Sequence, residues 1–209
     1  RNLVRTLFRK DAVNRYLLIG DPHRMEELGP LPENFQTLPY LRGDESAGNH
    51  FHLHFLLRDR AVELLHVPHV RVPLLVPCRY VVTVHDLADF LFPTDDGFRR
   101  SLRLYLARRG LTRAARILAV SRATRLDLAE FFRLPGKKIE VVYNAIDERF
   151  CRPCRYEEKK LVLERYGVVY PFALYAGNVK RQKNLARLIE AFAVLKGELR
   201  QHPVYADLK

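Results

Sequence analysis

A glycine turn followed by clustered cations lies near the C-terminal end of the sequence. Gly177 follows a short apolar segment, and Lys180, Arg181 and Lys183 precede a run with apolar residues at helical spacing. A glycine lets the backbone approach a ligand closely, the first N–H groups of a helix face outward, and a cation neutralises a phosphate. The pattern fits either a diphosphate site or a solvated basic turn before an ordinary surface helix. It is not a Walker A loop, because the closing Gly-Lys-Ser/Thr is absent.

A second candidate site follows the apolar run Tyr80–Val84, which ends at His85 and Asp86. Ligands of open parallel sheets bind at the carboxyl ends of the strands. A histidine there can exchange a hydrogen bond with a sugar hydroxyl near neutral pH. The alternative is a structural histidine that pairs with a loop carbonyl, while Asp86 closes the turn or fixes the histidine tautomer.

His66 and His69 also follow an apolar run, and Pro68 stiffens the turn between them. Three histidines at strand ends raise the question of a metal, but no carboxylate or cysteine stands at a known ligand offset. We therefore expect His66, His69 and Asp86 to line a polar pocket, and we expect no metal site.

These residues need a scaffold of alternating strands and helices. Strands are predicted at Tyr16–Ile19, Phe35–Leu38, Leu64–His69, Tyr80–Val84, Ile117–Val120, Ile139–Val142 and Phe172–Ala176. Helices are predicted at Asn49–Val62, Phe98–Leu111, Arg122–Phe132, Glu157–Tyr166 and Asn184–Leu195, with Ser121 as an N-cap. This order predicts an α/β fold with parallel βαβ units. The β-branched run Tyr80–Val84 predicts a strand buried on both faces.

The chain is expected to contain residues 1–150 as one domain, then a linker and the beginning of a second domain at 151–209. The linker holds Cys151 and Cys154, whose spacing fits half a zinc site or a redox pair, but no second ligand pair is evident. Three cysteines without a framework favour a reducing compartment. We expect the sequence to be a piece of a longer chain at both ends.

The net charge of +12 is compatible with nucleic acid, anionic lipid or phosphorylated ligands. No nucleic-acid fold signature or aromatic stacking platform appears, which disfavours nucleic acid. The segment Arg99–Arg116 interleaves arginines with apolar residues. It fits either an interfacial helix on an anionic membrane or an ordinary helix with a basic outer face.

Taken in order, the motifs resemble glycosyltransferase family 4 over nearly the whole chain. They are His66-Val-Pro-His69, Val81-Val-Thr-Val-His85-Asp86-Leu87, Phe92-Pro93, Ala119-Val-Ser121, Val141-Val-Tyr-Asn144-Ala-Ile-Asp147 and Gly177-Asn-Val-Lys-Arg-Gln-Lys183-Asn184-Leu185. The resemblance implies the GT-B fold, in which two Rossmann-like domains hold a nucleotide-sugar. It implies that His85 contacts the transferred sugar, that Asn144 lines the pocket, and that Gly177, Arg181 and Lys183 hold the donor diphosphate. Gln182 stands where the family often has an arginine.

The resemblance further implies a retaining, metal-independent transfer of a hexose from a nucleoside-diphosphate sugar to a glycan or lipid-linked acceptor. No cofactor is expected, and the protein is expected in the cytoplasm or at the inner face of the membrane. The family's glycine-rich first loop and its pair of glutamates are expected before Arg1 and after Lys209, so we expect these 209 residues alone to be inactive. Acceptor choice is expected in the loops 21–49 and 95–98. The alternatives are an epimerase or phosphorylase of the same fold, and a non-catalytic module that binds polyanions or membranes.

Overall fold

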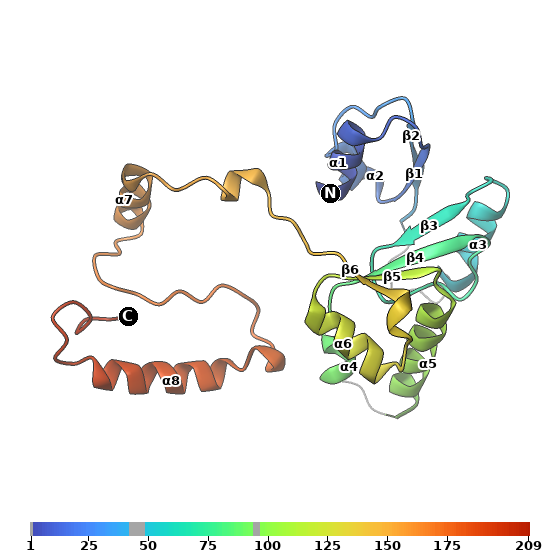
Figure 1. The fold of residues 1–209 in the computed structure, drawn as a ribbon. Helices are drawn as coiled ribbons and strands as arrows, with labels where there is room; N and C mark the ends of the chain where they lie inside the picture. The colour runs from blue at the N-terminus through green and yellow to red at the C-terminus, as the bar shows by residue number, and fades with distance from the viewer. Residues whose placement is uncertain (1, 42–48, 94–96) are drawn as a thin grey trace. The chain divides into compact units, whose positions relative to one another are not determined.

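The structure is a computed structural model that describes residues 2–41, 49–93 and 97–209. The contacts divide the chain into two compact units (Figure 1). The first comprises Arg1–Leu87 and Gly97–Asp147, and the second comprises Ala88–Asp96 and Glu148–Lys209. The domain boundary expected near residue 150 stays a prediction.

A four-stranded parallel sheet forms the centre of the first unit (Figure 1). Its strands are neighbours in chain order: β3 (Leu64–Val67), β4 (Arg79–Val84), β5 (Arg116–Ala119) and β6 (Ile139–Val141). The register pairs His66 with Val81 across β3 and β4, and Thr83 with Leu118 across β4 and β5. The prediction of parallel strands alternating with helices is confirmed. All four carboxyl ends therefore lie along one edge of the sheet.

The two faces of this sheet differ in burial, and here the sequence prediction was wrong. Tyr80, Val82 and Val84 of β4 are buried, whereas Val81 and Thr83 on the other face are only partly covered. The β-branched run suggested burial on both faces, but the helices Gly97–Arg113 and Arg122–Phe131 cover just one. Right-handed crossovers between neighbouring strands in sequential order place successive helices on the same face, which explains the asymmetry.

Helices α5 (Gly97–Arg113) and α6 (Arg122–Phe131) cover the buried face of the sheet. The hydroxyl of Tyr80 donates to the carbonyl of Gly110 at 2.8 Å, which ties β4 to α5. Ser121 caps α6 as predicted, because its hydroxyl oxygen accepts from the N–H of Thr124 at 3.0 Å. The 3-10 turn η1 (Gly136–Lys138) then leads into β6.

The first strands of the chain form a separate parallel pair, β1 (Tyr16–Gly20) and β2 (Phe35–Pro39). Phe35 is buried, stacks on Tyr16 with ring centroids 4.4 Å apart, and meets Phe8 edge-on at 4.5 Å. Phe8 belongs to the amphipathic helix α1 (Asn2–Lys10). The short helix α2 (Pro22–Glu26), capped by Asp21, was not predicted from the proline- and glycine-rich sequence.

Helix α3 (Asn49–Arg58) confirms the prediction at Asn49–Val62, although it ends earlier. The predicted acceptor loops at 21–49 and 95–98 lie partly outside the described residues. No helix in the described part of the chain combines the length and the apolar character needed to cross a bilayer.

The second unit contains α4 (Ala88–Leu91), η2 (Glu148–Phe150), α7 (Tyr156–Arg165), η3 (Arg181–Lys183) and α8 (Leu185–Glu198). The strand predicted at Phe172–Ala176 is absent from the described structure. A single parallel bridge replaces it: the N–H of Ala173 donates to the Lys209 carbonyl at 2.9 Å, and the N–H of Lys209 donates to the Pro171 carbonyl at 3.0 Å. An extended segment needs a longer hydrogen-bonded neighbour to become a strand, and here it has one residue of pairing.

Candidate active site

The carboxyl edge of the four-stranded sheet gathers the predicted site residues of the first unit. His66 lies near the end of β3, His69 follows that strand, and His85 and Asp86 follow β4. Asn144 follows β6, at the far side of the same edge. Because parallel strands end together, the fold brings these polar residues to one rim.

His66 and His85 are close enough to influence each other. The Nε2 atom of His66 shares a hydrogen bond with the Thr83 hydroxyl at 2.8 Å. Although His66 as a whole is exposed, the atoms packed around its ring lower its pKa by desolvation, and His85 lowers that pKa further. His66 therefore favours the neutral ring, which can both donate and accept hydrogen bonds.

The backbone of His85 is held from the neighbouring strand–helix junction. Its carbonyl accepts from the hydroxyl of Thr124 on α6 at 3.3 Å, and the Val84 carbonyl accepts from the Val120 N–H at 3.3 Å. The Thr124 hydroxyl also lies 2.9 Å from that of Ser121. The side chain of His85 is exposed while its backbone is anchored, which suits a residue that must present a ring to a ligand.

The remaining rim residues differ in how they are fixed. The Nδ1 atom of His69 accepts from the N–H of Arg71 at 3.1 Å, so its ring is tied to its own loop. Asp86 and Asn144 are exposed. The sequence analysis did not identify Thr83 and Thr124 as residues that hold the histidines in place. Thr83 had a readable signal, because a polar residue two positions before His85 in a strand faces the same side, whereas the role of Thr124 depends on tertiary packing.

The cationic turn of the second unit is described by itself. Gly177 leaves room for the ring of Tyr175, since a Cβ at Gly177 would lie 2.8 Å from the Tyr175 hydroxyl oxygen. That hydroxyl donates to the Asn178 carbonyl at 3.1 Å. Gly177, Arg181 and Lys183 are all exposed, and no acidic residue occurs between residues 165 and 189. The turn thus presents positive charge to solvent without a competing carboxylate in that stretch of sequence.

Lys183 lies just before the helix predicted at Asn184–Leu195, and the structure starts that helix one residue later. Lys183 ends the 3-10 turn η3, and α8 starts at Leu185. Between them Asn184 has φ 48° and ψ 46°, the left-handed region that asparagine tolerates better than most residues. The Leu188 N–H donates to the Asn184 carbonyl at 3.2 Å, so Asn184 still opens the helix.

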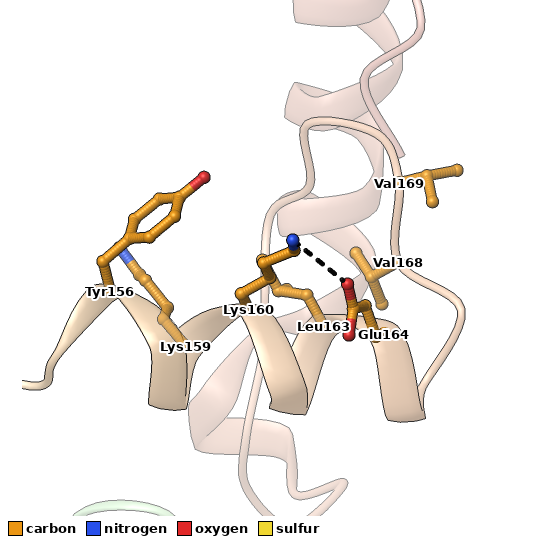
Figure 2. Close-up of a pocket in the computed structure, with 7 residues that line it drawn as sticks. All are labelled: Tyr156, Lys159, Lys160, Leu163, Glu164, Val168 and Val169. Carbon is orange, nitrogen blue, oxygen red and sulfur yellow. Dashed lines mark ion pairs between the residues drawn. The ribbon is translucent and has the colours of Figure 1, made fainter.

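The described residues also contain a pocket of about 200 Å³ on the second unit, with no predicted site residue in its lining. Figure 2 shows Tyr156, Lys159, Lys160, Leu163 and Glu164 on α7, and Val168 and Val169 in the loop that follows. Lys160 pairs with Glu164 at 3.7 Å within it. Within residues 2–41, 49–93 and 97–209, no three His, Cys, Asp or Glu side chains gather as metal ligands.

Comparison with known families decides the assignment. Residues 8–150, more than half of the chain, match the sequence profile of Glycosyltransferase Family 4. The chain belongs to glycosyltransferase family 4. The match includes the rim residues of the first unit, and the family expected from the motifs is confirmed. No curated protein matches the chain.

Sixteen chains of solved structure match this family 4 chain. One is the crystal structure of a glycosyltransferase from Rickettsia africae ESF-5, with a TM-score of 0.53 and 14% sequence identity. The match covers 88% of this chain and 58% of that one, so the chain spans little more than half of its neighbour's length. At this identity the likeness shows the fold, which is Rossmann-like and of the GT-B type.

Proposed function

We propose that this chain is part of a retaining transferase that moves a hexose from a nucleoside-diphosphate sugar to a glycan or lipid-linked acceptor. Membership of a glycosyltransferase family makes a sugar donor and acceptor the expected ligands. The observation that carries the finer proposal is the exposed, cation-rich turn at Gly177–Lys183, which has the chemistry for a donor diphosphate.

In the proposed reaction the bond between the sugar and the diphosphate breaks, and negative charge grows on the departing diphosphate. Lys183 and Arg181 would offset that charge, and the first N–H groups of α8 would add to the attraction. Gly177 lets the backbone come close to the phosphates. Because Gln182 carries no charge, Arg181 is the nearest second cation to Lys183 along the sequence.

His85 is proposed to orient the transferred sugar, with His66 and Asp86 as further hydrogen-bonding groups at the same rim. The neutral ring favoured at His66 can accept from one hydroxyl and donate to another, although its bond to Thr83 occupies Nε2. His69 and Asn144 complete the proposed pocket wall. We propose no cofactor and no metal for this step.

The proposal is tested by calorimetric titration of the chain with UDP, GDP and their glucose or mannose derivatives. Lys183→Ala and Arg181→Ala should each weaken binding about tenfold or more, since a charge-assisted hydrogen bond contributes roughly 1.5–3 kcal/mol. Lys196→Ala removes an exposed cation farther along α8 and serves as the matched control. Equal losses in all three variants, or no preference for diphosphates over monophosphates, would contradict the assignment.

A second experiment addresses the reaction class in a preparation that contains this chain and turns over donor. NMR of the product should show that the anomeric configuration of the donor is kept. Release or epimerisation of the sugar at the same rate with and without acceptor would instead favour an epimerase or phosphorylase.

A further inference from the structure

Helix α5 is held against the sheet in one orientation. Its buried side consists of Ala107, Gly110 and Leu111. A Cβ at Gly110 would lie only 2.7 Å from the Cβ of Val72, so helix and loop are in direct contact. The hydrogen bond from Tyr80 to Gly110 adds a second restraint. Which residues of α5 face outward is therefore fixed by its packing.

The outward side carries an apolar stripe, defined here as Phe98, Leu102 and Tyr105. These residues are 80%, 43% and 62% exposed. Their spacing of four and three positions puts them one above another on a single side of the helix. Isolated exposed apolar residues are normal on protein surfaces, whereas apolar residues grouped on one side of a helix are typical of surfaces that bind a partner or a membrane.

Arginines flank this stripe, and the structure separates those that face solvent from those that do not. Arg99, Arg108 and Arg113 are exposed. Arg109 instead turns to the adjoining loop, where its guanidinium donates to the Leu74 carbonyl at 2.8 Å. The sequence from residue 97 to residue 126 contains nine arginines and no aspartate or glutamate. The outer side of α5 is thus apolar along its centre and positive around it.

We propose that the outer side of α5 docks on an anionic phospholipid bilayer, parallel to its surface. Phe98, Leu102 and Tyr105 would enter the boundary between headgroups and acyl chains, while Arg99, Arg108 and Arg113 pair with lipid phosphates. This arrangement is that of an interfacial amphipathic helix, in which buried apolar area and attraction to anionic lipid act together. A soluble polyanion would match the arginines but leaves the stripe without an apolar partner. The proposal goes beyond the transferase function and does not depend on it.

Vesicle flotation tests the proposal with the whole 209-residue chain. Vesicles of phosphatidylcholine with about one third phosphatidylglycerol should carry the chain, and pure phosphatidylcholine vesicles should not. Removing the stripe by Phe98→Ser, Leu102→Ser and Tyr105→Ser should abolish flotation. Because these side chains are exposed, the circular dichroism of the variant should match that of the parent. Its matched control substitutes three exposed apolar residues elsewhere in the first unit: Val13→Ser, Leu41→Ser and Leu126→Ser.

A second set of variants separates the contribution of the α5 arginines from that of the net charge of the chain. A triple variant carries Arg99→Gln, Arg108→Gln and Arg113→Gln. Each of the three substitutions should weaken partitioning onto anionic vesicles about fivefold, the equivalent of roughly 1 kcal/mol for each basic residue near an anionic surface. A control of equal net charge carries Arg9→Gln, Lys10→Gln and Arg24→Gln, which are exposed on α1 and α2. Equal weakening by both triple variants would overturn the proposal, because general basicity would then explain the binding.

Tryptophan fluorescence can test directly whether the apolar stripe inserts into the bilayer. The chain contains no tryptophan, so Phe98→Trp introduces a single indole. Its emission should move to shorter wavelength with phosphatidylglycerol vesicles and stay unchanged with phosphatidylcholine. An unchanged spectrum with both, or tighter binding to single-stranded RNA than to the anionic vesicles at equal phosphate concentration, would refute docking on lipid.

Discussion

The contact between Gly110 and Val72 allows a sharp test of how α5 is held. Gly110 lies inside the helix, where alanine is favoured over glycine by about 1 kcal/mol. In this place, however, an added Cβ would lie 2.7 Å from the Val72 Cβ and 3.0 Å from its Cγ2. Real Cβ atoms do not approach this closely, so either helix or loop must move. Overpacking of this kind costs about 1–3 kcal/mol.

The two effects oppose each other in Gly110→Ala. Subtracting the helical preference from the steric cost leaves a net loss of up to about 2 kcal/mol, centred near 1 kcal/mol. Urea unfolding of the parent and variant, followed by far-ultraviolet circular dichroism, measures this difference. Gly136→Ala is the matched control, because the nearest atom to its added Cβ is the end of the Arg125 side chain at 3.6 Å. It should leave the midpoint unchanged or raise it.

A double-mutant cycle isolates the contact itself. Val72→Gly removes the three atoms nearest to the new Cβ, so Gly110→Ala in that background should stabilise the chain by up to about 1 kcal/mol. If Gly110→Ala behaves like Gly136→Ala, or if its effect is the same in both Val72 backgrounds, then the close approach of helix and loop is wrong.

Three further tests follow from the first unit and the linker. The lowered pKa of His66 means that the folded chain binds fewer protons than the unfolded chain, so the free energy of unfolding should fall as pH drops below about 6.5 and stay level above it. His66→Gln should flatten this pH dependence, measured by urea titration at several pH values. An unaltered pH dependence in the variant would contradict the pKa shift. Ser121→Ala should cost about 1 kcal/mol through loss of the α6 cap, measured as a lower urea midpoint. A thiol reagent should modify exposed Cys151 and Cys154 quickly and Cys78 slowly, because partial burial raises the pKa of the Cys78 thiol; three equal rates in the folded chain would count against this.

Elements with strong local signals were predictable from the sequence. The apolar runs of β4, β5 and β6 and the cap at Ser121 were located correctly, since each depends on neighbouring residues alone. The placement of His85 and His66 on one edge also followed, because parallel strands align their carboxyl ends. Their roles toward a sugar stay predictions.

What failed depended on partners distant in sequence. Phe172–Ala176 has the composition of a strand, but a strand needs a hydrogen-bonded neighbour. Within the part of the chain that the structure describes, Lys209 alone pairs with this segment. The partial exposure of Val81 and Thr83 on β4 could not be predicted from a β-branched run, because composition does not say which face of a strand a helix covers. The hydrogen bond from the Thr124 hydroxyl to the His85 carbonyl was equally unpredictable, because it joins residues from two different strand-to-strand connections.

Because β3 to β6 all run in the same direction, one edge of the sheet carries the predicted site residues and the opposite edge is better suited to accept an attached label. Every predicted rim residue of the first unit lies near or just after the carboxyl end of a strand, whereas the turn Gly136–Lys138 enters β6 at the opposite edge. Gly136 and Lys137 are exposed there, although the Lys138 ammonium donates to the Thr112 carbonyl and should be kept. A peptide tag or fluorophore placed after Gly136 would therefore sit on the side of the sheet away from the rim. Such an attachment point would let ligand titrations be followed optically without a label among the residues that are proposed to bind sugar.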